Sequence, residues 1–307
     1  IDVATILSTQ NVKEKFEKTK FKVLDTGIKH GTVTLISEKF KLEITSLRKD
    51  LETDGRHAEV EFIDDWKKDS ERRDFTINSI YLDIKGKIFD PQGGKNDLKN
   101  NNVKFIGDPQ KRIEEDYLRI IRFIRFCLEY SSNIEETTIK TIKLNLDGIK
   151  KISKERILAE LFKILKTKKY IKINNNKKLK SIFILIFPEL LYLWRLEKLT
   201  NKLFLEFLDI DTLLSVLIID EVNNHEYFSH KYNISNNLKE KLNKIAINFK
   251  HLNSDKNFFF KDLKKHVYFL GKKNLILLNI LNFSNNKKAK LNDFLKVNNN
   301  IKKINIP

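Results

Sequence analysis

The segment spanning residues 69–125 constrains the fold most, because it joins a compact charged block to a strongly helical run. The block reads RRDFTIN and places Arg72, Arg73, Asp74 and Asn78 within seven residues. The run that follows reads RIEEDYLRIIRFIRF. Its apolar residues recur every three or four positions, which predicts a single amphipathic helix with a charged face.

The charged face of this predicted helix carries carboxylates and arginines at helical spacing. Glu115 lies four residues before Arg119, Asp116 lies three residues before it, and Arg122 follows three residues later. A carboxylate beside an arginine offers an acceptor and a fork of donors, which can read the edge of a nucleobase. The alternative is a solvated helix with ion pairs along its own surface.

Two segments near the N-terminus alternate between apolar and polar residues, as strands with one wet face do. They read IDVATILS and FKLEITSL, and a helix is predicted between them at residues 9–18. If the two strands are neighbours, Asp2 and Glu43 project from the same face of a sheet. Carboxylate oxygens gathered on a rigid sheet suit Mg²⁺, although carboxylates on a wet face are usually only solvated.

The connections between these blocks are polar. Residues 48–70 are predicted to form a charged surface loop that pivots at Gly55, and His57 in this loop has no second histidine or cysteine nearby to form a metal site. The block DPQGGKNDL predicts a turn and lacks the pattern of a Walker-type phosphate loop. Its Asp90, Gly94 and Asp97 are therefore expected to be architectural.

The net charge of +18 is concentrated in the second part of the chain. Residues 1–130 hold 25 lysines and arginines against 24 acidic residues, whereas residues 131–307 hold 34 against 17. This distribution is typical of a polyanion-binding region attached to a nearly neutral domain. The alternative is a compositional bias toward lysine, asparagine and isoleucine, which raises the number of lysines at solvated positions.

The second part of the chain shows only helical patterns. A helix capped by Ser153 is predicted near residues 153–167, and further helices are predicted at 177–187, 189–208, 211–222, 235–250, 258–270 and 274–282. No apolar stretch reaches 18 residues, so no membrane span is expected. The single Cys127 excludes an intramolecular disulfide, suits a reducing compartment, and is expected to be buried.

The blocks RRDFTIN, DPQGGKNDL and EDYLR together resemble the signature blocks of class II tRNA nucleotidyltransferases, the CCA-adding enzymes, and of bacterial poly(A) polymerases. The resemblance runs from Ile1 to about Thr167. It implies an α+β fold, with a small mixed β-sheet nucleotidyltransferase head followed by an all-helical neck, body and tail. The implied domains are a head at 1–107, a neck at 108–168, and a tRNA-binding body and tail at 169–307.

The resemblance also assigns roles to residues of this chain. It implies that Arg73, Asp74 and Asn78 hold the ribose and triphosphate of a nucleotide. Asp116 and Arg119 would read the base of CTP or ATP, with Glu115 orienting Arg119 and Arg122 completing the nucleotide-binding set. Asp2 and Glu43 would be the catalytic carboxylates that bind Mg²⁺. IDVAT resembles the end of the family's D-x-D strand, so we expect its first aspartate and a Gly-rich turn before Ile1.

The implied activity is addition of C, C and A to the tRNA 3′ end from CTP and ATP, with release of pyrophosphate. DGRHAEVEF favours full CCA addition, and GIKHGTVTL favours a tRNA enzyme over a poly(A) polymerase. The alternatives are poly(A) polymerase, CC-only or A-only addition, and a non-catalytic tRNA-binding protein.

The expected partner is the tRNA acceptor arm, bound by the basic helical half. The expected compartment is the cytoplasm, or the mitochondrion if a segment before Ile1 carries a targeting signal. The sequence indicates no oligomeric state.

Overall fold

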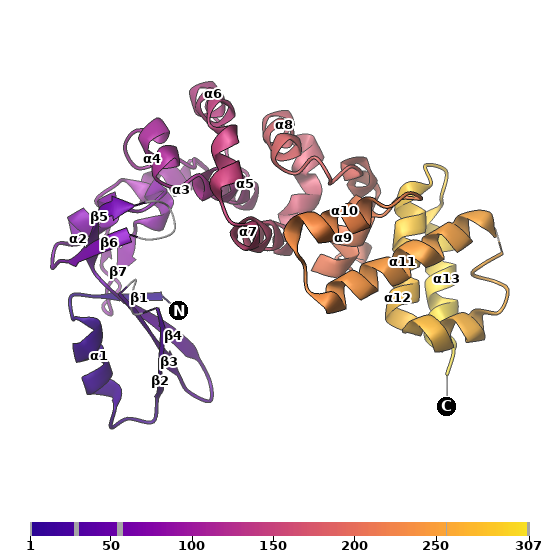
Figure 1. Ribbon diagram of the computed structural model, residues 1–307, viewed down its shortest axis with the longest axis horizontal. Helices are drawn as coiled ribbons and strands as arrows, with labels where there is room; N and C mark the ends of the chain where they lie inside the picture. The colour runs from indigo at the N-terminus through magenta and orange to yellow at the C-terminus, as the bar shows by residue number, and fades with distance from the viewer. Residues whose placement is uncertain (1, 28–30, 54–57, 256, 306–307) are drawn as a thin grey trace. The chain divides into compact units, whose positions relative to one another are not determined.

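The computed structural model describes residues 2–27, 31–53, 58–255 and 257–305 (Figure 1). The chain divides into two compact units. The first comprises Ile1–Phe123 and Tyr130–Ile149, and the second comprises Ile124–Glu129 and Lys150–Pro307. The division falls within one helix. The partition into 1–107, 108–168 and 169–307 stays a prediction.

The first unit begins with a mixed four-stranded sheet in the order β1-β4-β3-β2. Its strands are β1 (Asp2–Thr5), β2 (Lys22–Gly27), β3 (Thr32–Ile36) and β4 (Lys41–Ser46). β1 pairs with β4 in parallel, and the other pairs are antiparallel. Helix α1 (Thr9–Phe16) lies against β3, where Val12 packs with Val33, Leu35 and Ile44 (Figure 1). The predicted strands and helix are thereby confirmed, since their apolar faces share one core.

Residues 48–70 do not form the predicted loop. They form an antiparallel hairpin of β5 (Arg48–Thr53) and β6 (Ala58–Phe62), and helix α2 begins at Trp66 and ends at Glu71. Asp65 caps α2 by accepting from the backbone of Lys67 and Lys68. The high charge of this segment hid its strands, because hairpin strands need only one partly covered face. Gly55 and His57 lie outside the described residues.

The rest of the first unit is built from short elements around the charged block. A 3-10 turn spans Thr76–Asn78, and β7 (Tyr81–Leu82) pairs with β8 (Ile88–Phe89). Helix α3 (Gly94–Lys99) follows the predicted turn, with Asp90 accepting from the backbone of Gly94 and Lys95. A Cβ on Gly94 would lie 2.1 Å from the Thr76 oxygen, so only glycine fits at this close approach.

The predicted single helix around Glu115 is wrong, because the chain breaks at Asp116 and Tyr117. Helix α4 (Pro109–Glu115) ends there and helix α5 (Leu118–Tyr130) begins. Asp116 has extended backbone angles and accepts from the Leu118 amide, as a residue that caps a helix does. Tyr117 packs so closely on Gly148 that a Cβ there would lie 2.0 Å from its ring. Beyond α5 come α6 (Glu136–Leu144) and a 3-10 helix (Leu146–Lys151).

The second unit is helical in its described residues, as predicted. It contains α7 (Lys154–Lys166), α8 (Lys177–Ile186), α9 (Ile210–Ile218), α10 (Asn224–Tyr232), α11 (Asn236–Ser254), α12 (Leu263–Asn285) and α13 (Leu291–Lys303). Further 3-10 helices span Lys168–Asn175, Leu193–Leu199 and Lys202–Phe204. Ser153 occupies the predicted cap position of α7, and Cys127 is buried as predicted.

One helix prediction in the second unit is wrong, because the segment 189–208 contains short 3-10 turns and no α-helix. The segments 258–270 and 274–282 both fall on α12, whose backbone is non-helical at Gly271, so the predicted interruption between them is confirmed. The first of these two helices begins at Leu263 and not at residue 258. Helices α10 and α13 were not predicted, because both lie in asparagine-rich sequence. In α13 this sequence obscures the apolar side that buries Phe294, Val297 and Ile301.

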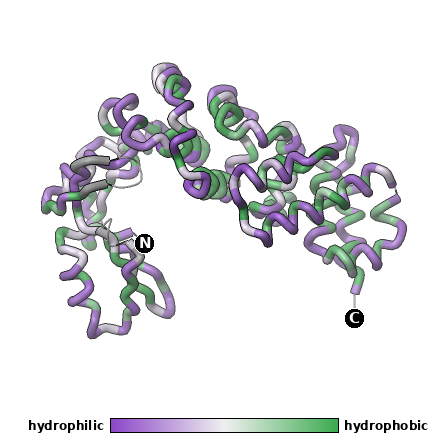
Figure 2. The backbone as a smooth tube through the Cα atoms, viewed as in Figure 1, coloured by the Kyte–Doolittle hydropathy of each residue, from purple (hydrophilic) through white to green (hydrophobic). Residues whose placement is uncertain are grey.

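Hydrophobic and hydrophilic residues are interleaved along these helices (Figure 2). Among the described residues, no helix is both long enough and apolar enough to cross a membrane. The hydrophobic residues instead form the interiors of the two units.

Candidate functional site

Two carboxylates meet on the sheet of the first unit, as the strand patterns predict. Asp2 on β1 lies directly opposite Glu43 on β4 in the parallel register. Residues opposite each other on neighbouring strands project from the same face, so both carboxylates share one side of the sheet. Asp2 is exposed, and the Glu43 carboxylate lies 2.5 Å from the Lys41 amine.

This pair fits a hard divalent cation chemically but supplies only part of its ligand shell. Mg²⁺ binds oxygen ligands, often one or two carboxylates together with water and substrate phosphates. Within the described ranges, no group of three or more histidine, cysteine, aspartate or glutamate side chains is placed to hold a metal. Asp2 and Glu43 are therefore suited to a cation that shares its coordination with a bound phosphate.

A carboxylate that sequence reasoning missed, Asp69, lies at the centre of the charged block. It is fully buried near the end of α2 and accepts from the Arg48 amide, from the guanidinium groups of Arg72 and Arg73, and from the Tyr81 hydroxyl. Burial raises the pKa of Asp69, but the charge of Arg72 and these hydrogen bonds outweigh it and hold the pKa below its usual value. Asp69 is thus a buried anion that organises the residues around it.

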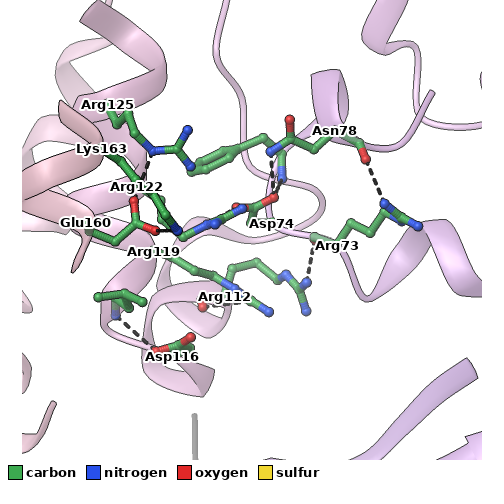
Figure 3. A network of polar contacts seen from close by, with 12 residues as sticks. Arg73, Asp74, Asn78, Arg112, Asp116, Arg119, Arg122, Arg125, Glu160 and Lys163 are labelled. Carbon is green, nitrogen blue, oxygen red and sulfur yellow. Dashed lines mark hydrogen bonds and ion pairs between the residues drawn. The ribbon is translucent and has the colours of Figure 1, made fainter. Parts of the chain in front are cut away.

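Asp74 is the second buried carboxylate of the block. Its Oδ1 accepts from the Phe75 amide and from the Asn78 side chain at 2.9 Å, and its Oδ2 accepts from Arg122 at 2.6 Å (Figure 3). Burial raises the pKa of Asp74, yet the charge and hydrogen bond of Arg122 bring it below the usual range. The structure therefore brings the predicted residues Asp74, Asn78 and Arg122 together.

Glu115 lies between two arginines. Its Oε2 accepts from Arg112 at 2.5 Å and from Arg119 at 2.6 Å, although the helix that was predicted to align Glu115 with Arg119 is interrupted. Arg112, which sequence reasoning also missed, donates through Nη2 to the backbone oxygens of Arg72 and Arg73 at 2.6 Å. Arg119 donates to the Arg112 oxygen at 2.9 Å. The predicted orienting role of Glu115 thus has a geometric basis.

Asp116 lies beside this network but not on the helical face where it was expected. Its Oδ1 accepts from the Leu118 amide at 3.1 Å, so the side chain caps α5 while Arg119 extends from the first turn (Figure 3). Both residues are partly exposed. Their joint contact with a base stays a prediction.

Arg119, Arg122 and Arg125 form a stripe with a three-residue spacing along α5, and each makes a different ion pair. Arg119 pairs with Glu115 and Arg122 pairs with Asp74, both within the first unit. Arg125 pairs with Glu160 at 2.9 Å in the second unit. A spacing of three residues rotates each successive side chain around the helix, so the stripe does not act as one surface.

A polar pocket of about 360 Å³ opens beside the Glu115 pair. Its lining combines basic and acidic side chains from β5, α2 and α4, namely Lys49, Asp50, Lys68, Glu71, Arg72, Arg112 and Glu115. Lys49, Lys68 and Glu71 are exposed, so the outer lining carries charges of both signs. Such a lining of charged donors and acceptors suits a polar ligand.

The buried carboxylates predict how acid affects the stability of the first unit. Because the folded pKa values of Asp69 and Asp74 lie below that of an unfolded aspartate, about 3.9, their stabilisation is present above that value. This stabilisation is lost as the pH falls through the pKa values that the two carboxyl groups have in the folded protein. Urea unfolding between pH 6 and pH 3 should show a constant free energy at the upper end and a steep decline below about pH 4. The decline should be shallower for Asp74→Asn, and an unchanged slope in this variant would contradict the assignment.

Two segments of the chain match known protein families. Residues 1–104 match the family described as poly A polymerase head domain. Residues 133–192 match the family described as probable RNA and SrmB-binding site of polymerase A.

Curated proteins with similar sequences are named as CCA-adding enzymes. Human mitochondrial CCA tRNA nucleotidyltransferase 1 is 46% identical over 169 residues, which are 54% of this chain and 39% of the human protein. The CCA-adding enzyme of Lactobacillus helveticus is 41% identical over 166 residues, 53% of this chain and 41% of that enzyme. The matches thus span about two-fifths of the length of these relatives.

Solved structures share the fold over nearly the whole chain. The CCA-adding enzyme of Bacillus stearothermophilus, solved in complex with CTP, superposes with a TM-score of 0.74 at 21% identity, covering 98% of this chain and 72% of that one. A tRNA nucleotidyltransferase solved with a primer tRNA and an ATP analog superposes with a TM-score of 0.71 at 21% identity, covering 98% of this chain and 89% of that one. These structures confirm the predicted α+β fold, in which a small mixed β-sheet is followed by a helical body. Residues 1–104 and 133–192 thus match two domains of the poly(A) polymerase type, and the chain is similar to CCA-adding enzymes over about half of its length.

Proposed function

We propose that this protein adds C, C and A to the 3′ end of tRNA, takes the nucleotides from CTP and ATP, and releases pyrophosphate. The observation that carries the proposal is the Arg73–Asp74–Asn78 block, which is joined to the Glu115–Arg119 pair by hydrogen bonds from Arg112. The names of the curated relatives support the same activity.

The proposed reaction transfers a nucleotide to the tRNA 3′ hydroxyl, whose oxygen attacks the α-phosphorus while the bond to pyrophosphate breaks. Asp2 and Glu43 would hold Mg²⁺, which lowers the pKa of a bound hydroxyl and neutralises charge on the phosphates when present. Lys41 lies two residues before Glu43 on β4 and adds a positive charge on the same face of the sheet. The contribution of the protein is mostly positioning and charge compensation, as in other phosphoryl transfers.

The charged block would hold the sugar and phosphates of the incoming nucleotide. Arg73 suits the phosphates because guanidinium groups donate in a planar fork. Asp74 suits a ribose hydroxyl, since a carboxylate offers about four lone-pair sites and three of them are used by Phe75, Asn78 and Arg122. The fixed positions of these donors favour a single orientation of the nucleotide.

Asp116 and Arg119 would read the base. Glu115 fixes the guanidinium of Arg119, and Asp116 offers a carboxylate one turn away. A base that fails to satisfy such groups leaves them unpaired, which is how polar sites reject the wrong substrate. This arrangement would select CTP or ATP without a nucleic-acid template.

The basic helical half would bind the acceptor arm of tRNA through its phosphates. Residues 131–307 carry twice as many basic as acidic residues, 34 against 17. Binding through phosphates would weaken as salt rises, because counterions released on binding return. We expect the protein to act where tRNA is processed, in the cytoplasm or, as the human relative's name states for that protein, in the mitochondrion.

The experiment that tests this function uses the full gene product with Mg²⁺ and three tRNA transcripts, ending before CCA, after C and after CC. Labelled CTP or ATP is supplied, with oligo(A) as a control primer. Ordered addition that stops at the terminal A, and loss of addition in Asp116→Ala, are the expected results. Long A tails on oligo(A) would instead identify a poly(A) polymerase, which the family descriptions also name. Salt-sensitive tRNA binding without addition would identify a non-catalytic binding protein.

A further inference from the structure

We propose that Asp69 is a positioning residue for the incoming nucleotide, acting through Arg73. This inference rests on the proposed function, in which Arg73 holds the triphosphate. Asp69 itself is fully buried and is expected to touch neither nucleotide nor tRNA. Its role is to fix the direction in which the Arg73 guanidinium presents its remaining donors.

The contacts of Asp69 are unusually numerous for one side chain. Oδ1 accepts from the Arg48 amide at 3.1 Å and from Arg72 Nη2 at 2.7 Å. Oδ2 accepts from Arg73 Nη2 at 3.2 Å and from the Tyr81 hydroxyl at 2.7 Å. One buried negative charge therefore faces two guanidinium groups, which leaves a local excess of positive charge suited to phosphates.

Arg73 is confined on three sides by this arrangement. Asp69 holds one edge of its guanidinium, the Asn78 oxygen accepts from Nη1 at 3.2 Å, and the ring of Tyr81 lies under its face at 5.2 Å. Its side chain still keeps 30% of its surface exposed. A long side chain is thus ordered before any ligand arrives, which avoids the entropy cost of ordering it on binding.

The side chain of Arg73 and the proposed base-reading residues, Asp116 and Arg119, are held by different contacts. The backbone oxygens of Arg72 and Arg73 accept from Arg112, and Glu115 bonds to both Arg112 and Arg119. Arg112 donates to main-chain oxygens, whereas Glu115 joins two side chains, and neither set of contacts includes Asp69. Loss of the Asp69 charge should therefore loosen the Arg73 side chain and leave base selection intact.

Asp69 also connects this region to the sheet with the paired carboxylates. The Arg48 amide that it accepts from belongs to the first residue of β5, and Leu47 joins β5 to the end of β4, the strand of Glu43. The Arg72 guanidinium donates to the Arg48 oxygen at 3.0 Å. The proposed phosphate-binding arginine and the proposed cation ligands are thus held on one continuous framework.

The test compares Asp69→Asn with wild type by steady-state kinetics of C and A addition in the full gene product. We expect the KM for CTP and for ATP to rise by the same factor, roughly tenfold or more. We expect kcat to change by less than about threefold, because the triphosphate is bound in both the ground state and the transition state. Discrimination against UTP and GTP should stay unchanged. A general loosening of the fold would instead alter kcat and base selection together.

Asp97→Asn is the matched control. Asp97 is another buried aspartate of the first unit, and it accepts from the Thr76 hydroxyl at 2.8 Å outside the Asp69 network. Its variant should lose stability without a change in KM for either nucleotide. An equal rise in KM in both variants would show that the loss of any buried negative charge in this unit raises KM, and it would overturn the proposal.

A double-mutant cycle tests whether Asp69 acts through Arg73. Arg73→Ala should raise KM by itself, and adding Asp69→Asn should raise it by no more than about twofold further, because coupled residues give non-additive effects. A double variant whose rise in KM equals the product of the rises in the two single variants would overturn the proposal. If Arg73→Ala leaves KM unchanged, the proposed triphosphate role of Arg73 is wrong. A rise in Arg73→Ala without one in Asp69→Asn would refute only the role of Asp69.

Tyr81→Phe is the second variant, in case Asp69→Asn does not fold. It removes one hydrogen bond to Asp69 and keeps the aromatic ring beneath Arg73. We expect a rise in KM of about two- to fivefold for both nucleotides, smaller than in Asp69→Asn, because Asp69 keeps its charge and its other hydrogen bonds. An unchanged KM in a folded Tyr81→Phe protein would contradict the proposal.

Discussion

Replacing Glu43 by glutamine is expected to lower the rate of nucleotide addition by about a thousandfold, since metal and charge stabilisation supply several kcal/mol to such reactions. Glutamine keeps the size of the side chain and its hydrogen-bonding capacity but removes the negative charge opposite Asp2. The loss should appear in kcat, measured as the single-turnover incorporation of labelled CMP at saturating CTP.

Glu38→Gln provides the control for this measurement. Glu38 is an exposed residue in the turn between β3 and β4, so its substitution changes the net charge equally without reaching the carboxylate pair. Its rate should match wild type. A Glu43→Gln protein that keeps its fold and more than a tenth of the wild-type rate would show that these carboxylates are only solvated residues of the sheet.

Replacing Asp74 by alanine is expected to destabilise the first unit by about 3–5 kcal/mol, because it removes one partner of a buried ion pair. The change removes the contact with Arg122 at 2.6 Å and the hydrogen bonds that Asp74 accepts from the Phe75 amide and the Asn78 side chain. Urea unfolding of the two proteins at pH 7 measures the difference. Nucleotide addition should also be lost, because the proposed ribose acceptor is absent.

The double variant Asp74→Ala, Arg122→Met separates these two effects. Replacing both partners by apolar groups often restores stability, since no charge is left buried without its partner. We expect the double variant to recover much of the unfolding free energy while addition stays lost. Recovery of activity together with stability would mean that Asp74 serves the fold alone.

The parts of the fold that follow local patterns were predictable from the sequence. Alternation on β1 and β4 predicted that Asp2 and Glu43 share a face, and the register confirms it. Helical periodicity predicted a helical second unit, although the short 3-10 turns within 189–208 were not foreseen. The periodicity of a segment shows which of its faces is apolar. That is sufficient to predict a helix or strand when only one face is buried against the rest of the protein.

The parts that depend on contacts distant in sequence were not predictable. The break at Asp116 arises from helix capping and from the fit of Tyr117 against Gly148, whereas the pattern of charges suits one helix equally well. Asp69 stands in a highly charged run that resembles a solvated surface. Its burial becomes evident only when Arg48 and Tyr81, far from it in sequence, are seen to donate to it.

A crystal structure of the full gene product with CTP and, separately, with ATP would show directly where the nucleotide binds. We expect the triphosphate to lie against Arg73 and the ribose to lie against Asp74. We also expect both bases to contact the same two residues, Asp116 and Arg119, with the Glu115–Arg119 contact preserved. A nucleotide bound elsewhere, or a base held without Asp116 and Arg119, would contradict the assignment of this network as the nucleotide site.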